Sequence, residues 1–214
     1  MSERALSAAL ESRVPAATAA VCTEQRLLPP AQKEGGMPLF SALSLRHSSR
    51  EYSDRALPEQ LLSNLLWAAF GVNRPAGERT APYWRHVMVI DIYAAMADGV
   101  WLYEPEKHAL LRHLSHDVRA QTGEQGFAAV APLDLIYVAN GDRMSDLPFG
   151  ARHLYSYVDA AFIGENVYLC CAAEGLGTVF RGAINRTKLT RALKLSRGQF
   201  VTFAQTVGYP PAST

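Results

Sequence analysis

The stretch YSYVDAAFIGENVYLCCAAE, residues 155–174, decides the fold that we expect from this sequence. Only four of its side chains are charged or amides, and the others are apolar, small or aromatic. A helix that is apolar nearly all round is buried on most sides. In a chain of 214 residues this predicts a long helix at a subunit interface, where Gly164 allows close approach of another helix. The four polar residues are Asp159, Glu165, Asn166 and Glu174.

Further helices and strands are expected on both sides of this stretch. Apolar residues at helical spacing predict helices, and short runs rich in β-branched residues predict strands. Residues 99–114 read as a hairpin, with a helix as the competing interpretation. Because helices come first and strands mix with helices afterwards, the predicted class is α+β. The other predicted helices are 39–45, 58–70 and 187–195, and the predicted strands are 87–95, 99–103, 109–114, 133–139, 178–184 and 200–207.

The amino-terminal residues differ in composition from the rest of the chain. Residues 1–38 are rich in Ala, Ser and Glu, and the pairs Pro29-Pro30 and Gly35-Gly36 oppose regular structure. Leu27 and Leu28 could pin this segment to a surface. We therefore expect an amino-terminal arm over 1–38 and one domain over 39–214.

Composition and charge exclude several classes of protein. The formal net charge is +1 and no apolar run reaches about 18 residues, so we expect neither nucleic-acid nor membrane partners. Three cysteines, two of them adjacent, suit a reducing, cytoplasmic compartment, with Cys170 and Cys171 as small core residues. His113 and His116 lie in a predicted strand, where their spacing does not suit a metal, and we expect no metal site.

Two short stretches carry the candidate chemistry. The first, Arg46-His47-Ser48-Ser49-Arg50, places two guanidiniums, an imidazole and two hydroxyls just after a helix, which suits a phosphate. The alternative is a solvated basic turn. The second stretch, residues 175–183, follows the long helix, and its three glycines would let backbone approach a flat ligand. The alternative there is a helix stop followed by a tight turn.

Together these stretches resemble the nitroreductase family over about residues 27–210. The resemblance also rests on Leu65–Gly71, on Arg79-Thr80-Ala81-Pro82 and on the closing Thr206–Pro210. Within the family the chain is most similar to the SagB-type branch, which includes azoline-oxidising enzymes. The resemblance implies a central, mostly antiparallel sheet flanked by helices, a homodimer with the long helix at its interface, and flavin mononucleotide (FMN) as cofactor.

The resemblance also implies roles for individual residues. Arg46 and Ser48 would hold the FMN phosphate, His47 would lie along the cofactor, and Arg50 would lie beside N1 and O2 of the flavin. A cation there stabilises the negative charge that arrives with hydride at N5. A backbone N–H from the turn after the long helix would reach N5. The residues of that turn are Phe180, Arg181, Gly182 and Ala183.

The sequence departs from the family pattern at two places. Where relatives offer Asn and Gln to the flavin ring, spacing places His86 and Met88, of which Met88 is a poor hydrogen-bonding group. Tyr83 and Trp84 would crowd or stack in the substrate pocket, with ordinary loop packing as the alternative. The tail also lacks the cation that many relatives add to the phosphate site, so the phosphate would rely on Arg46, or borrow Arg181 or Arg186.

The expected function is an FMN-dependent, ping-pong oxidoreductase. Hydride would pass from NAD(P)H through flavin N5 to a small nitroaromatic or quinone-like acceptor, and no side chain is expected to act as a catalytic acid or base. One alternative is a flavin-dependent oxidase of a biosynthetic intermediate such as an azoline. Another is a dimer with a decayed site that binds without catalysis.

Overall fold

The fold is built on a single β-sheet, seen in a computed structural model that describes residues 24–211. The strands are β1 (Gln25–Leu27), β2 (Ile90–Met96), β3 (Gly99–Glu104), β4 (Ala109–Leu114), β5 (Leu133–Asn140), β6 (Gly177–Arg181) and β7 (Gln199–Gly208). The strand β7 is rich in β-branched and aromatic residues, which favour extended backbone, whereas β1 and β4 contain none of them.

The seven strands follow the order β1-β4-β3-β2-β5-β7-β6, and every described pairing is antiparallel. The interior strand β5 is buried along nearly its whole length, because helices cover both faces of the sheet. Its neighbour β7 pairs with both β5 and β6, and so joins the middle of the sheet to the edge.

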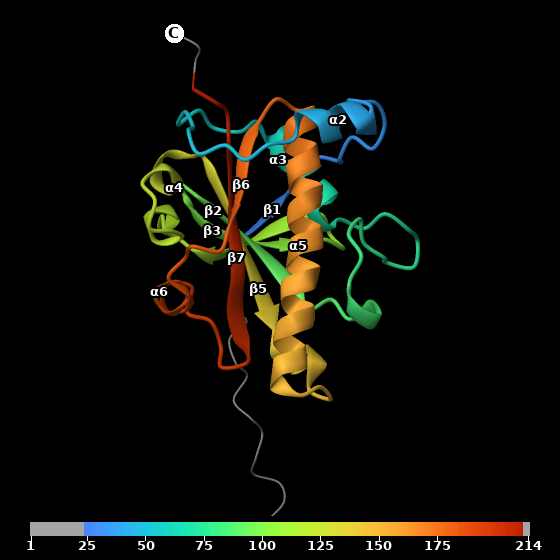
Figure 1. Ribbon diagram of the computed structural model, residues 1–214, viewed down its shortest axis with the longest axis vertical. Helices are drawn as coiled ribbons and strands as arrows, with labels where there is room; N and C mark the ends of the chain where they lie inside the picture. Colours follow the sequence, from blue (N-terminus) through green and yellow to red (C-terminus); the bar gives the residue numbers. More distant parts are fainter. Residues whose placement is uncertain (1–23, 212–214) are drawn as a thin grey trace, which may run out of the picture.

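The helices divide between the two faces of the sheet (Figure 1). The longest helix, α5, packs with α3 over one face, and α2 packs against α5. On the other face, Leu189 of α6 and Leu193, which follows that helix, belong to a second apolar cluster, and α4 lies on the same side in Figure 1. The helices are α2 (Leu39–Leu45), α3 (Glu59–Phe70), α4 (Phe127–Val130), α5 (Phe149–Ala173) and α6 (Arg186–Ala192), with short 3₁₀ turns at Trp84–His86, Arg119–Gln121 and Gly141–Met144.

Most predicted elements are present, with shifted ends. The hairpin over 99–114 is confirmed and its helical alternative is wrong. The long helix begins at Phe149, six residues before the predicted start, because Pro148 precedes its first turn and the apolar pattern continues upstream. The strand expected at 87–95 begins only at Ile90, after a segment where Arg85 and His86 have φ of 44° and 61°.

Part of the predicted arm belongs to the sheet. The strand β1 pairs with β4, and Leu28 is 7% exposed, whereas Leu27 is 69% exposed. The Ser63 hydroxyl of α3 donates a hydrogen bond to the Pro29 carbonyl (2.6 Å) and so holds the chain just after β1. Residues 1–23, including Cys22, lie outside the described part of the chain.

Membrane-spanning helices and metal-ligand clusters can both be looked for among the described residues. No helix within residues 24–211 is both long enough and apolar enough to cross a bilayer. Over the same residues, no three His, Cys, Asp or Glu side chains come together as metal ligands would. His113 lies in β4, where its Nε2 is 2.6 Å from the Leu193 carbonyl.

Candidate functional site

The basic turn that follows α2 lies against α5. Arg46 is half-buried, with its guanidinium 5.2 Å from the Tyr168 ring centre and its Nε 4.0 Å from a Glu165 carboxylate oxygen. His47 is exposed, and its Nδ1 lies 2.8 Å from the Leu45 carbonyl. Arg50 is exposed, and its guanidinium makes no hydrogen bond or ion pair with residues 24–211. The turn therefore carries two cations whose charges are at most weakly compensated.

Tyr168 of α5 joins this turn to β6. Its hydroxyl lies 2.8 Å from the Ser48 Oγ and accepts the backbone N–H of Phe180 (2.9 Å). One residue along, the Ser49 N–H donates to the Thr178 carbonyl (2.9 Å). Two segments that sequence analysis singled out separately are thus in contact. Tyr168 was missed, although a tyrosine in a helix expected to be buried needs a polar partner for its hydroxyl.

The carboxyl-terminal end of β6 packs beneath aromatic rings. The ring of Phe180 stacks with Tyr137 (5.7 Å between centres) and lies against Phe203 (4.5 Å). Gly182 and Ala183, which follow β6, are exposed. This end of the strand therefore has a fixed aromatic base and an accessible backbone turn.

Arg181 does not contribute a cation to this turn, contrary to the expectation that a phosphate could borrow it. Its side chain is 3% exposed, and Nη2 forms an ion pair with the fully buried Asp134 (2.9 Å). Thr122 supplies two more acceptors at 3.1 Å. Separating a buried ion pair leaves an uncompensated buried charge, at a cost of about 3–5 kcal/mol, so this guanidinium is not available to a ligand. The guanidinium of Arg186 is also engaged, and donates to the Thr202 carbonyl (2.8 Å).

The loop that carries Tyr83, Trp84 and His86 is fixed to α5 at a different point. The Trp84 ring stacks on Tyr155 (5.2 Å), and its backbone N–H donates to both carboxylate oxygens of Asp159 (3.2 and 3.1 Å). Tyr83 lies edge-on to the His86 ring, 5.8 Å away between centres. The loop geometry depends on this contact with α5.

Asp159 is nearly buried, with 3% of its surface exposed. Burial raises the pKa of its carboxyl to about 6, and the hydrogen bond from Trp84 offsets part of that rise. What sequence analysis missed is the partner, which lies 75 residues away along the chain.

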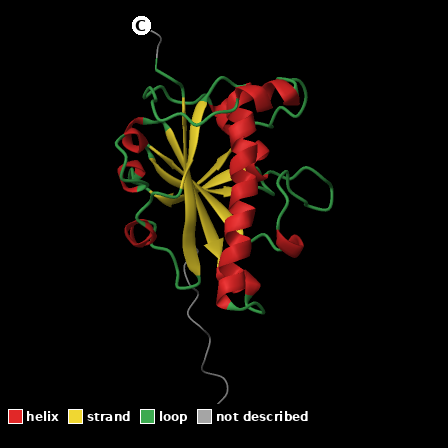
Figure 2. Cartoon of the chain, viewed as in Figure 1, coloured by secondary structure: helices red, strands yellow, loops and turns green. Residues whose placement is uncertain are grey.

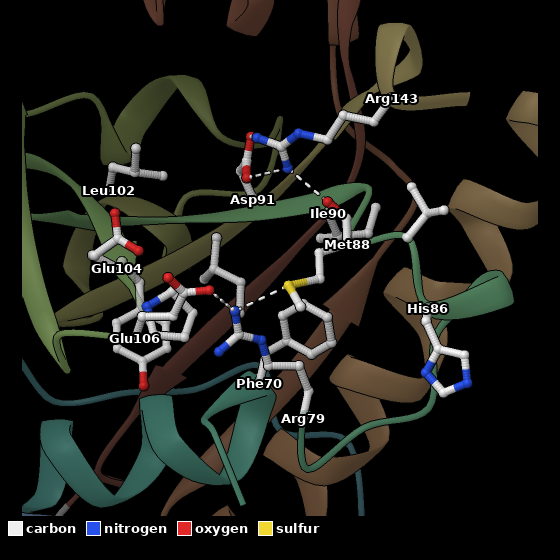
Figure 3. Close-up of a pocket in the computed structure, with 14 residues that line it drawn as sticks. Phe70, Arg79, His86, Met88, Ile90, Asp91, Leu102, Glu104, Glu106 and Arg143 are labelled. Atoms are coloured by element: carbon white, nitrogen blue, oxygen red, sulfur yellow. Dashed lines mark hydrogen bonds and ion pairs between the residues drawn. The ribbon is translucent and has the colours of Figure 1, made fainter. Parts of the chain in front are cut away.

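A cavity of about 540 Å³ lies beyond this loop, between the loop, α3, β2 and β3. His86 and Met88 line it, together with Arg79, whose Nη2 lies 3.0 Å from the Met88 sulfur and 3.2 Å from a Glu106 oxygen. Figure 3 shows Arg79 and Met88 pointing toward each other, while the His86 ring lies apart from them. We refer to this as the Arg79 cavity; the sequence analysis used Arg79 only as part of the family resemblance and did not name Glu106.

The predicted site residues thus form two groups on α5. The turn 46–50 and β6 meet at Tyr168, and the loop 83–88 meets the helix at Tyr155 and Asp159. Thirteen residues separate Tyr155 from Tyr168, which corresponds to roughly 20 Å along the helix axis. In Figure 1, β6 and the loop lie on opposite sides of α5.

Exposed apolar side chains lie on α5 and α2, two helices that pack against each other. On α5, Leu154, Val158 and Phe162 recur at every fourth position and are 60%, 39% and 46% exposed. On α2, Phe40 is 84% exposed. A soluble monomer rarely exposes a large contiguous apolar surface. We call this surface the α2–α5 face; its residues are Leu39, Phe40, Leu43, Leu45, Phe149, Leu154, Val158 and Phe162.

Comparison with known proteins agrees with these features. The nitroreductase family matches residues 43–209. A candidate nitroreductase from Methanocaldococcus jannaschii is 32% identical over 167 residues, which cover 73% of this chain and 84% of that protein. The crystal structure of a candidate nitroreductase from Ralstonia eutropha JMP134 is 42% identical, with a TM-score of 0.85 over 88% of this chain and 90% of that one.

A more distant structure shares the fold. The NADPH:FMN oxidoreductase from Vibrio harveyi, solved in complex with NAD+, is 18% identical, with a TM-score of 0.61 over 81% of this chain and 69% of that one.

Proposed function

The chain belongs to the nitroreductase family, and we propose that it is an FMN-dependent oxidoreductase that works as a homodimer. The observation that carries this proposal is the contact of the basic turn with β6 through Tyr168. It joins a group of phosphate-binding side chains to a strand whose end offers exposed backbone. The distant Vibrio harveyi structure, whose name includes FMN, is consistent with the same cofactor.

The donor set of the turn fits the anionic end of a mononucleotide. In this proposal Arg46 and Ser48 bind the phosphate, because a guanidinium and a hydroxyl are favourable phosphate donors. His47 lies along the cofactor. Arg50, which has no partner among residues 24–211, places its charge at the N1 and O2 edge. When bound, FMN supplies the redox chemistry, by accepting hydride from NAD(P)H and reducing a nitroaromatic or quinone-like acceptor.

The other predicted contacts would orient the flavin ring. The exposed Gly182 and Ala183 offer backbone N–H groups, and the packed ring of Phe180 keeps that turn in place. Across α5, Asp159 acts as a positioning residue, because it holds the backbone of Trp84. The Trp84 ring, stacked on Tyr155, then forms a rigid wall for the substrate pocket.

The test of the cofactor site is the flavin content of an Arg46→Ala/Arg50→Ala double variant. We expect the purified wild type to be yellow and to release FMN on denaturation. Losing one charge-assisted contact to the phosphate costs about 1.5–3 kcal/mol, or about tenfold or more in affinity. The matched control is Arg191→Ala/Arg197→Ala, which removes two exposed arginines elsewhere. Unchanged flavin content in the first variant would refute the proposed site.

The proposed homodimer is supported by the α2–α5 face. Burying its apolar side chains against a second copy would stabilise the pair by the hydrophobic effect. Val158→Glu/Phe162→Glu should therefore shift the protein from dimer to monomer in analytical ultracentrifugation. Val130→Glu, at a 46% exposed position on α4, is the control that should remain dimeric. A wild type that sediments as a monomer contradicts the proposal.

The direction of electron flow has its own test. Anaerobic mixing with NADH or NADPH should bleach the bound flavin if nicotinamide is the donor. A flavin that stays oxidised, but is reduced by an azoline-containing peptide, would instead support the SagB-type oxidase.

A further inference from the structure

Arg79 is a buried cation whose hydrogen bonds are incomplete. Its side chain is 3% exposed, and only Nη2 has partners, which are the Met88 sulfur and a Glu106 oxygen. Nε and Nη1 are buried and make no hydrogen bond with the described residues. A guanidinium removed from water normally satisfies its N–H groups with acceptors. Arg79 therefore has unused donors on the wall of a cavity.

The carboxylate that reaches Arg79 is held loosely. Glu106 lies in the turn between β3 and β4, and its side chain is 65% exposed. It makes a single contact of 3.2 Å, although a carboxylate can bind both terminal nitrogens of a guanidinium at once. Because the Glu106 carboxylate is largely exposed, it returns to water at little cost when it leaves Arg79. A competing carboxylate could replace Glu106 without disturbing the core.

The remaining cavity wall is suited to an apolar molecule that carries an acid. Phe70, Ile90 and Leu102 contribute apolar surface. The other cation, Arg143, is already bound to Asp91 through two contacts of 2.8 and 3.1 Å. Figure 3 shows that pair at the opposite side of the cavity from Arg79. Arg79 is thus the cation on this wall with hydrogen-bonding capacity left for a ligand.

We propose that the Arg79 cavity binds a small organic acid with an apolar body. The ligand carboxylate takes the place of Glu106 on Nη1 and Nη2 of Arg79, and its body packs against Phe70 and the adjacent apolar wall. Without ligand, the Glu106 carboxylate accepts a hydrogen bond from Arg79, and the ligand carboxylate displaces it. His86 and Met88, which spacing places beside the flavin ring, line the same cavity. Such an acid is therefore also the substrate class of the flavin site, a step that rests on the proposed function.

The test is the binding of phenylacetate to the purified full-length protein, measured by calorimetry. Removing the competing carboxylate with Glu106→Gln should tighten binding about fivefold, the upper range for displacing a carboxylate that is itself exposed to water. The matched control is Glu104→Gln, which removes an equal charge from the same cavity without touching Arg79, and it should change the affinity less than Glu106→Gln does. Arg79→Gln should weaken binding about tenfold or more, the loss expected for a charge-assisted hydrogen bond.

Neutral and cationic analogues of phenylacetate test whether the cavity selects a carboxylate. Phenylacetamide should bind more weakly than phenylacetate. Three results would overturn the proposed acid site. They are stronger binding of 2-phenylethylamine than of phenylacetate, equal effects of the Glu104 and Glu106 substitutions, and no saturable binding of phenylacetate. Should Arg79→Gln fail to fold, the comparison of the two glutamate variants still decides. Flavin content is recorded separately, so Glu106-dependent binding by a colourless protein refutes the proposed function alone, and a yellow protein without that binding refutes this inference alone.

Discussion

Replacing Asp159 with Asn should make the protein more stable at neutral pH. The carboxylate is 3% exposed, and the one hydrogen-bond donor found for it among residues 24–211 is the Trp84 N–H. A carboxamide of the same shape keeps an oxygen for that N–H and carries no charge. The substitution therefore removes the cost of burying an ion while the Trp84 loop keeps its anchor.

The size and sign of this effect follow from the pKa of Asp159. Burial raises that pKa from 3.8 to about 6 in the folded protein. The difference of about two units corresponds to at most about 3 kcal/mol. Below the unfolded pKa both states hold the proton, and the full stability is present. As the pH rises through the folded pKa, that contribution is lost in the wild type and is kept in the Asn variant.

The assay is urea denaturation at pH 4.5 and at pH 7.5, at one fixed protein concentration. We expect the free energy of unfolding of the variant to exceed that of the wild type at pH 7.5, and the difference to shrink at pH 4.5. Asp146→Asn, an exposed position, is the control and should behave like the wild type at both pH values. The reasoning fails if Asp159→Asn shows the wild-type pH dependence, or if it destabilises the protein at pH 7.5.

Three further substitutions test the packing behind the proposed site. Gly164→Ala would place a Cβ 2.5 Å from the Phe180 ring and should cost about 1–3 kcal/mol, seen as a lower urea midpoint. Arg181→Met leaves the fully buried Asp134 without its cation and should cost about 3–5 kcal/mol in the same assay; a smaller loss would show that Asp134, whose pKa burial already raises, takes up a proton when the cation is removed. Tyr168→Phe leaves the Phe180 N–H without its acceptor, and should cost about 1–3 kcal/mol and lower the flavin content; full flavin with normal stability would contradict its bridging role.

Helices and strands were predictable where the pattern is local. The β3–β4 hairpin and β5 are present because runs of apolar and β-branched residues between turns favour strands whatever lies around them. The helix α5 was predicted from its apolar character, although its start was placed six residues late. The face of α5 left uncovered could not be found in this way, because it depends on where α3 and the sheet pack.

Elements that depend on distant partners were not predictable. The strand β1 has three residues, and it exists because it pairs with β4 more than eighty residues later. The loop 83–88 was expected to be partly strand, but Asp159 holds the Trp84 backbone from 75 residues away. Short segments take their conformation from such contacts, since their own propensities are too weak to decide it.

The same dependence decides which arginines can hold a ligand. From the sequence, Arg46 was the expected phosphate donor, and Arg181 or Arg186 was a residue that the phosphate could borrow. In the structure Arg181 is neutralised by Asp134, 47 residues away, whereas Arg46 meets Glu165 only at 4.0 Å, in a half-exposed pair. A buried ion pair does not give up its cation to a ligand, but a half-exposed one can. An anionic cofactor on this face must therefore depend on the turn after α2, and the protein should lose most of that affinity when the turn loses its arginines.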